Sequence, residues 1–210
     1  MSTVNKLILT LTLFLMTGLA EAASVSYYLD RNNALLPDSS YLKVTISDNA
    51  NGADVDFRVD VLHDAFTSPD FSLTSNFGMQ SFYFNYDNTL TVDTGNIVSI
   101  DPSAWNVQTS KNADGYGLFQ FDLKGNGSTR TETLFFTVAN VSGDNVNSYA
   151  VNSTGSAGGS GEYFAAHVAG FDYNGTTSAF FAGSSPVPVP AAIWLLSSGL
   201  LGLVGFRRRS

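Results

Sequence analysis

Three carboxylates on one short segment have the spacing that best fits catalysis. Asp54, Asp56 and Asp60 share the polar side of the alternating segment Val55–Val61. In a β-strand, side chains two residues apart lie about 6.5 to 7 Å from each other on one face, which suits a paired acid and base. The same alternation keeps the outer face of a half-buried strand hydrated, and we favour this structural role.

No other set of residues matches a known catalytic machinery. The chain has two histidines, His63 and His167, and His167 lies within the strand-like Ala165–Val168, where we expect a packed, hydrogen-bonded side chain. The motifs Gly-x-Ser-x-Gly and His-Glu-x-x-His are absent from the sequence. The absence of cysteine removes disulfides, thiolate metal sites and a cysteine nucleophile. We therefore expect no catalytic residues and no enzyme.

Calcium is the one cofactor that the composition of the loops suggests. The loops are rich in Asp and Asn, and calcium binds carboxylate and carbonyl oxygens. Neither of two glycine-containing loops fits an EF-hand. Aligning Gly52 with the loop glycine places Ser47 at the first ligand position and Arg58 at the last, and aligning Gly127 places Lys124 at the third. We expect no metal site and no cofactor, and we keep calcium binding as an alternative.

The residues around these candidates predict the scaffold that must position them. Short alternating runs are separated by turn-forming clusters, and no segment has a convincing amphipathic helical period. This pattern predicts an all-β fold, an antiparallel β-sandwich (jelly-roll-like), over residues 23–183. We expect eight or nine strands, among them Val25–Leu29, Tyr41–Ser47, Val55–Val61, Ser81–Tyr86, Ile97–Ile100, Gly117–Leu123, Thr133–Val141 and Glu162–Val168. The Ser- and Gly-rich stretch Ser153–Gly161 is expected to be a mobile loop.

Composition and charge describe one folded body that does not bind nucleic acid. The chain has 210 residues, enough for one ordinary domain, and its 13 % aromatic residues can supply a core. Residues 23–186 carry six Lys and Arg against 17 Asp and Glu, a net charge of −11. Because an acidic body without a basic stripe cannot neutralise phosphates, we expect no nucleic acid among the partners.

The N-terminus has the order of a secretory signal peptide. An apolar run from Leu7 ends in Ala20-Glu21-Ala22, which places small residues at the two positions that signal peptidase reads. At 14 residues the run is short for a membrane span. We predict a signal peptide helix over residues 1–22, cleavage by signal peptidase between Ala22 and Ala23, and export from the cytoplasm.

The C-terminus has three parts in a fixed order. Residues 184–190 form a Ser/Pro-rich linker with a Pro-x-Pro motif, which disfavours a helix and keeps the chain extended. The apolar run 191–206 predicts a single transmembrane helix of about 24 Å, a minimal membrane span. Glycines at every third position form a smooth strip on this helix, and the last four residues hold three arginines that the positive-inside rule places in the cytoplasm. These residues are Gly199, Gly202, Gly205, Arg207, Arg208 and Arg209.

This tail resembles the PEP-CTERM sorting signal of bacterial exosortase substrates, in its VPLPA-CTERM variety. The matching residues are Val187, Pro188, Val189, Pro190, Ala191, Ala192 and Trp194, followed by the glycine strip. Val189 stands where the Pro-Glu-Pro form has glutamate, a position at which the VPLPA variety tolerates an apolar residue. A softer similarity covers Gly127–Phe171, which resembles the last strands of many such substrates, where an Ala-Ala-His-Val element, here Ala165–Val168, is frequent. An ordinary single-pass anchor is the alternative for the tail.

The resemblance implies a destination rather than a reaction. It implies recognition by a membrane-embedded exosortase, a transient inner-membrane-tethered intermediate, and transfer to the cell surface or extracellular matrix of a Gram-negative bacterium, in a setting of exopolysaccharide and biofilm. We therefore expect an exported, non-enzymatic surface or matrix protein. The first alternative is a carbohydrate-binding β-sandwich module with aromatic side chains that stack on sugar rings. Candidates for that stacking are Tyr27, Tyr28, Trp105, Tyr116 and Tyr173. A glycan hydrolase that uses the acidic residues is the least favoured alternative.

Overall fold

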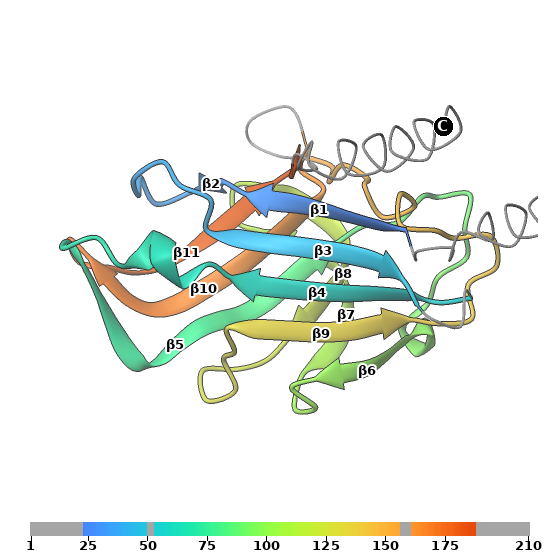
Figure 1. Cartoon of the computed structure of the whole chain (residues 1–210), viewed down its shortest axis with the longest axis horizontal. Coiled ribbons are helices and arrows are strands. Elements are labelled where there is room, and N and C mark those ends of the chain that lie inside the picture. Colours follow the sequence, from blue (N-terminus) through green and yellow to red (C-terminus); the bar gives the residue numbers. More distant parts are fainter. Residues whose placement is uncertain (1–22, 50–52, 156–160, 188–210) are drawn as a thin grey trace, which may run out of the picture.

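The computed structural model describes residues 23–49, 53–155 and 161–187, which form a sandwich of two antiparallel β-sheets (Figure 1). Sheet A contains, in spatial order, β12 (Ser185–Pro186), β1 (Ser24–Leu29), β3 (Leu42–Asp48), β4 (Val55–Val61), β9 (Thr133–Val138) and β6 (Ile97–Asp101). Sheet B contains β2 (Arg31–Asn32), β11 (Thr176–Gly183), β10 (Phe164–Tyr173), β5 (Phe71–Phe84), β8 (Gly117–Lys124) and β7 (Asn106–Ala113). Within the described ranges, helical structure is limited to two short 3-10 helices, η1 (His63–Phe66) and η2 (Thr94–Asn96). The predicted all-β antiparallel sandwich is confirmed.

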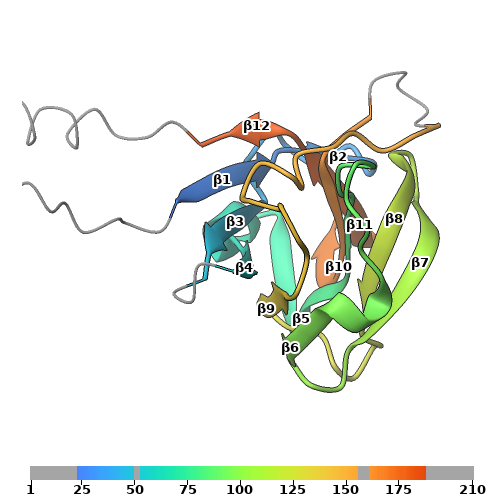
Figure 2. The same cartoon turned by 90° about the vertical axis from the view of Figure 1, so that its right-hand side faces the viewer.

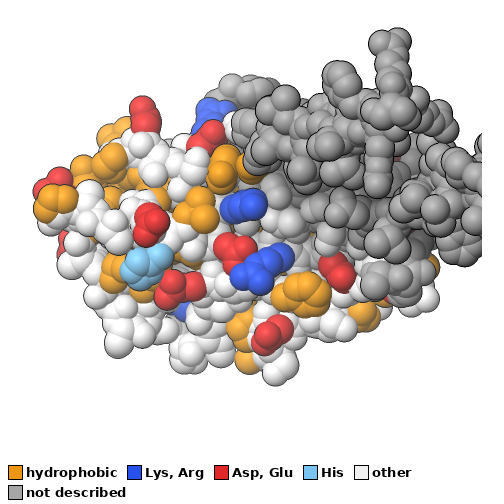
Figure 3. All heavy atoms as spheres, in the orientation of Figure 1, with side chains coloured by type: hydrophobic (Ala, Val, Ile, Leu, Met, Phe, Trp, Pro, Cys, Tyr) orange, Lys and Arg blue, Asp and Glu red, His pale blue; other side chains and the backbone are white. Residues whose placement is uncertain are grey.

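Strand β4 shows how the alternating sequence produces the two layers. Val55, Phe57, Val59 and Val61 are buried between the sheets, while the charged residues between them lie on the outer face of sheet A. The register with β9 continues the buried row, since Phe57 pairs with Phe136 and both rings are fully buried. Figure 3 shows the outer face of sheet A, on which acidic and basic side chains are interspersed. The hydrophobic effect therefore fixes which face of β4 points inward.

Several strands are longer than predicted from the sequence or were not predicted at all. Strand β5 begins at Phe71, well before the predicted start at Ser81, and β2, β7, β11 and β12 have no predicted counterpart. Most of β7 is exposed and polar, and in the first half of β5 only Phe71 and Leu73 pack against the core, so neither segment has the longer apolar alternation that marks a half-buried strand. Pairing with β10 and β8 holds them in the sheet instead. Tertiary pairing thus adds strands that local sequence does not show.

Two glycines allow β5 and β10 to bend together. The ladder between these strands shifts register twice, and Gly78 (φ +145°) and Gly170 (φ +88°) lie at the second shift. A Cβ atom on Gly170 would lie 2.5 Å from the carbonyl oxygen of Asn76, and one on Gly78 would lie 2.8 Å from the backbone of Thr131. Both the backbone conformation and the close approach therefore require glycine at these positions.

One residue joins the two edges of sheet B. Asn33 follows β2 at one edge, and its side-chain amide donates to the main-chain oxygen and the carboxylate of Asp114, in the turn between β7 and β8 at the other edge, at 3.4 and 3.3 Å. The same residue forms backbone and side-chain hydrogen bonds with the main chain of Phe180 in β11. Sheet B is therefore curled, and its two edges meet at the β7–β8 turn.

A second, smaller core fills the space beneath this turn. Its buried members are Tyr83, Ala113, Tyr116, Phe119, Ala165 and Ala182. Tyr83, Ala165 and Ala182 alternate with residues of the main core, so they lie on the face of sheet B that points away from sheet A. We call this face the outer face of sheet B. It is covered near the β7–β8 turn, and the open part lies towards the bend at Gly170.

Candidate functional site

The two ends of the folded body leave it at the same place. Strand β12 pairs with β1 at one edge of sheet A, as Figure 2 shows, and the amide of Val187 donates to the carbonyl oxygen of Ser26 at 2.9 Å. The carbonyl oxygen of Ala23 accepts from the amide of Asp48 at 2.9 Å, so the residue after the predicted signal-peptidase cut is also attached to the sheet. Ala23 and Val187 are therefore close together, at the start of β1.

Most of the residues predicted for processing and membrane insertion lie outside the described ranges. They are Ala20, Ala22, Pro188, Val189, Pro190, Ala191, Ala192, Trp194, Gly199, Gly202, Gly205, Arg207, Arg208 and Arg209. Of the predicted linker 184–190, the described part includes β12, and the side chain of Ser184 donates to Glu162. In the part of the chain that the structure describes, no helix is long and apolar enough to cross a membrane.

The three candidate carboxylates of β4 and its preceding turn are engaged in holding sheet A together. Asp56 accepts hydrogen bonds from the side chains of Asn49 and Thr137, at 2.7 to 3.0 Å. Asp60 accepts from Arg58 and Thr133, and Asp54 accepts from the amide of Asn140 at 3.0 Å. Each carboxylate thus bridges neighbouring strands or a turn, which agrees with the structural role favoured for this alternation.

The two histidines lie apart and have different surroundings. The ring of His167 stacks on that of Phe180, with centroids 4.6 Å apart, and His63 contacts Glu132 through Nδ1 at 3.2 Å. Burial lowers the pKa of His167, and the positive charges of Arg130 and Lys124 lower it further. His167 is therefore a neutral ring near neutral pH that packs on Phe180 as expected, whereas the expected hydrogen bond of its side chain is not found among the described residues.

The proposed sugar-stacking aromatics are mostly part of the interior. Tyr27, Trp105 and Tyr116 are buried, and the indole nitrogen of Trp105 donates to the carbonyl oxygen of Thr129 at 2.7 Å. Tyr28 and Tyr173 are half-buried. Three of the five candidates are therefore not available for stacking on a sugar, because Tyr27 and Trp105 belong to the main core and Tyr116 to the second core.

The acidic loops form one shallow hollow, at the end of sheet A. Asp48, Asp54 and Asp144 line it together with Val141 and Gly143. Burial raises the pKa of Asp144, the hydrogen bond that the Tyr149 hydroxyl donates to it at 2.6 Å acts in the opposite direction, and the nearby Asp54 and Asp48 raise the pKa again. Across the described ranges, no three His, Asp or Glu side chains are arranged to hold a metal ion.

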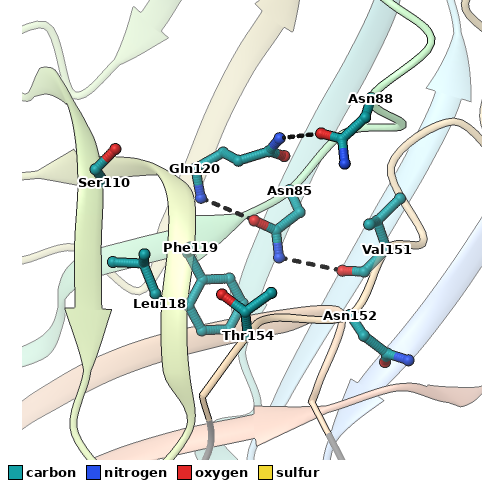
Figure 4. A pocket seen from close by; sticks show the side chains of 9 residues that line it. All are labelled: Asn85, Asn88, Ser110, Leu118, Phe119, Gln120, Val151, Asn152 and Thr154. Carbon is teal, nitrogen blue, oxygen red and sulfur yellow. Dashed lines mark hydrogen bonds between the residues drawn. The ribbon is translucent and has the colours of Figure 1, made fainter.

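A pocket lined by neutral amides lies beside the β7–β8 hairpin (Figure 4). The side chain of Asn85 is buried. Its Oδ1 accepts from the main-chain amide of Gln120 at 2.8 Å, and its Nδ2 donates to the carbonyl oxygen of Val151 at 3.2 Å. The side chain of Gln120 in turn donates to Oδ1 of Asn88 at 2.8 Å. This chain of bonds fixes the amide groups in one geometry, as Figure 4 shows.

The same pocket offers groups that suit a neutral, hydroxyl-rich ligand. It has a volume of about 120 Å³, and the side chain of Leu118, which lines it, is 45 % exposed. Among the described residues, no hydrogen-bond partner is found for the side-chain nitrogen Nδ2 of Asn88 or for the hydroxyl of Ser110. Hydroxyl and amide groups beside an apolar side chain can donate to and accept from a sugar without any charge. We call this site the amide pocket.

A second hollow lies on the open part of the outer face of sheet B. It has a volume of about 340 Å³, and its polar lining residues are Thr74, Gln80, Arg130, His167, Asp172, Thr177 and Ser178. The Arg130 guanidinium donates to the side chain of Gln80 and to the carbonyl oxygen of Asn76, at 3.4 and 3.1 Å, so it is held over β5. We call this hollow the outer-face groove.

Asp122 of β8 lies on the same face and is buried. Its neighbours Phe121 and Leu123 belong to the main core, and it pairs with Tyr83 of β5, so its side chain points to the outer face. Within the described residues its Oδ1 has no hydrogen-bond partner. Burial raises the pKa of Asp122 to about 6, although Lys124 and Lys111 act in the opposite direction.

The residues of the two hollows were not predicted to form binding sites, and His167 was considered from the sequence only as a packed side chain. Asn85 lies near the end of a predicted strand and Asn88 lies in a turn-forming segment, and the partners that turn them towards a pocket come from distant segments of the chain. The cations of the outer face did leave a signal, because Lys111, Lys124 and Arg130, half of the six Lys and Arg in residues 23–186, fall within 20 consecutive residues.

Comparison with known proteins adds no family to these observations. No protein-family model matches the chain, and neither curated proteins nor solved structures contain a significant match to it.

Proposed function

We propose that the chain is an exported, non-enzymatic protein of the cell surface or extracellular matrix of a Gram-negative bacterium, delivered there by an exosortase-type sorting tail. The observation that carries this proposal is the order of Val187-Pro-Val-Pro190, an apolar run and three terminal arginines. The hydrogen bond from Val187 to Ser26 supports it, because the sorting motif then begins where the folded body ends. Signal peptidase and exosortase would act on the same end of the sandwich.

The surroundings of the acidic residues support a non-enzymatic body. Asp56 and Asp60 accept hydrogen bonds from neighbouring strands, and neither faces a histidine or a second carboxylate across a pocket. A general acid and base need a shared cleft in which a substrate atom reaches both groups. Asp54 does share the acidic hollow with Asp48 and Asp144, but its carboxylate accepts from the main-chain amide of Asn140, and neither histidine lines that hollow. Binding or structural work is therefore the better supported role.

The amide pocket favours carbohydrate binding as a second candidate function. Its fixed amides and its exposed Leu118 offer hydrogen bonds and an apolar contact without charge. Individually weak contacts of this kind become effective when many copies of a surface protein meet one polymer. We infer that a neutral part of the producer's own polysaccharide is the ligand that fits this pocket best.

The sorting proposal is tested by the mass of the mature protein. In the wild-type host, the protein recovered from outside the cell should lack Arg207, Arg208 and Arg209, and deletion of the exosortase should leave the tail in place. Replacing Pro188 and Pro190 together with alanine should also retain the tail. Pro186→Ala is the matched control, because Pro186 lies in β12 before the motif, and it should be processed normally. A full-length tail in wild-type cells, unchanged by loss of the exosortase, would make the segment an ordinary anchor.

The carbohydrate proposal is tested by retention on the producer's polysaccharide. Asn88→Ala removes a side chain from the amide pocket and should weaken retention, whereas Asn147→Ala, in an exposed loop outside the pocket, should not. No sugar release is expected from either protein. Turnover of the polysaccharide that Asp56→Asn abolishes would show instead that the body is a hydrolase.

A further inference from the structure

The few cations of this acidic body are unevenly placed. Of the six Lys and Arg in residues 23–186, Arg31 pairs with Glu162 and Arg58 pairs with Asp60. Another three lie at the outer face of sheet B and form no ion pair with any described carboxylate: Lys111, Lys124 and Arg130. The sequence predicted no basic stripe, and the fold assembles one on a protein whose body otherwise carries excess negative charge.

The strand register places this cation cluster beside an aromatic platform. Lys124 of β8 pairs with Ser81 of β5, Ser81 pairs with His167 of β10, and His167 pairs with Phe180 of β11. Since neighbouring strands are about 4.8 Å apart, the backbones at Lys124 and His167 are about 10 Å apart. Arg130 lines the outer-face groove together with His167. One continuous row therefore places a cation and a stacked His–Phe pair on either side of Ser81, whose buried hydroxyl donates to that of Tyr83 at 3.1 Å.

The row has an unsatisfied acceptor next to it. Asp122 is 1 % exposed, and its Oδ1 is without a hydrogen-bond partner among the described residues. A buried polar atom without a partner costs free energy until a donor reaches it. Lys111 and Lys124 are the charged neighbours of this carboxyl. The cations of this face therefore have two carboxyl groups near them, of which Asp172 lines the groove and Asp122 is buried beside it.

We propose that the outer face of sheet B binds an anionic polysaccharide whose sugar rings carry carboxylates. Arg130, Lys124 and Lys111 meet the carboxylates, and the His167–Phe180 pair contacts a sugar ring. Sugar hydroxyls bind Gln80 and Ser178, which line the outer-face groove. Three separated cations fit charges that are spaced along a polymer of sugars, whereas the net charge of −11 opposes a polyanion as dense as nucleic acid. This assignment rests on the proposed surface function and names the polymer class that the body meets.

The test compares binding of soluble polymers to the full chain, purified in a non-ionic detergent. The probes are polygalacturonate, neutral dextran and inorganic polyphosphate. The variant Lys124→Gln/Arg130→Gln removes two cations from the outer face of sheet B. The variant Lys43→Gln/Arg58→Gln makes the same change of net charge on sheet A and is the matched control. Because Arg130 also bonds to Asn76 and Gln80, Arg130→Lys and Lys111→Gln/Lys124→Gln separate charge from loop structure.

The wild-type chain is expected to bind polygalacturonate better than dextran or polyphosphate, and to lose affinity with added salt. The outer-face double variant should weaken polygalacturonate binding about tenfold. The control double variant should weaken it by less than about twofold, and Arg130→Lys should bind polygalacturonate with nearly wild-type affinity. Equal weakening by the control, equal or tighter binding of polyphosphate, or no binding of polygalacturonate would each overturn the assignment. The sorting proposal is read from the mass of the mature protein, so these outcomes leave it unaffected.

Discussion

The rings of Phe57 and Phe136 stack across the middle of sheet A, with centroids 4.6 Å apart and planes 12° apart. Each also contacts Phe84 of sheet B, at 5.3 and 5.4 Å. The pair therefore links the two layers at the centre of the main core. One residue earlier in β9 the situation reverses, because the side chain of Phe135 points outward and is 37 % exposed.

Truncation of these two neighbours in β9 should separate the contribution of the core from that of the surface. Phe136→Ala is expected to lower the free energy of unfolding by about 3 to 5 kcal/mol, because it removes a buried ring and leaves a cavity. Phe135→Ala should cost less than about 1 kcal/mol. Urea unfolding followed by fluorescence measures both. Equal losses would mean that the alternation of β9 is assigned to the wrong faces.

The bend at Gly170 predicts a large difference between two glycines of similar backbone conformation. Gly170 and Gly175 have φ of +88° and +89°, but a Cβ atom on Gly175 would meet nothing within 4 Å. Gly175→Ala should cost about 1 kcal/mol of conformational strain. Gly170→Ala adds a clash with Asn76 and should cost at least about 2 kcal/mol more. Thermal unfolding compares the variants, and similar melting temperatures would show that β10 does not approach β5 as described.

Burial of Asp122 predicts a specific dependence of stability on pH. Its pKa rises from 3.8 to about 6 on folding, so the folded chain holds this proton more tightly than the unfolded chain. This group therefore favours folding at pH below about 4, and the advantage is lost as pH rises to about 6 and above. The free energy of unfolding of Asp122→Asn, relative to that of the wild type, should therefore increase by about 2 kcal/mol between pH 4 and pH 7.5.

Denaturant unfolding at the two pH values measures this difference. Asp70→Asn is the control, because Asp70 is exposed in the turn before β5, and its unfolding free energy should follow the wild type at both pH values. If Asp122→Asn also follows the wild type, then Asp122 is hydrated or paired in solution.

The predicted signal peptide leads to a defined N-terminus. The exported protein should begin at Ala23, and Ala22→Tyr should leave the leader attached, because signal peptidase needs a small residue before the cut. Glu21→Gln is the control, since it changes the residue between the two small positions and should leave the cut unchanged. N-terminal sequencing of exported material decides this. A protein outside the cell that still begins at Met1 would show that the leader is not removed.

The alternation of apolar and polar residues was sufficient to predict the sandwich and the inner face of β4. It could not predict β7 or the first half of β5, because these strands bury few side chains and are held by hydrogen bonds to β8 and β10. The row of cations and aromatic rings on the outer face of sheet B could not be predicted from the sequence for a similar reason. Lys124 and His167 are far apart in sequence, and only the register through Ser81 brings them into one row.

The short strand β12 also determines how copies of this protein behave when they are crowded. Without it, sheet A would end at β1, whose free amide and carbonyl groups could recruit a strand from another molecule. Strand β12 occupies part of this edge, and Pro186 has no amide hydrogen with which to extend the ladder outward. When molecules are packed densely in a surface layer, this edge of the sandwich should therefore resist pairing with a strand from another copy.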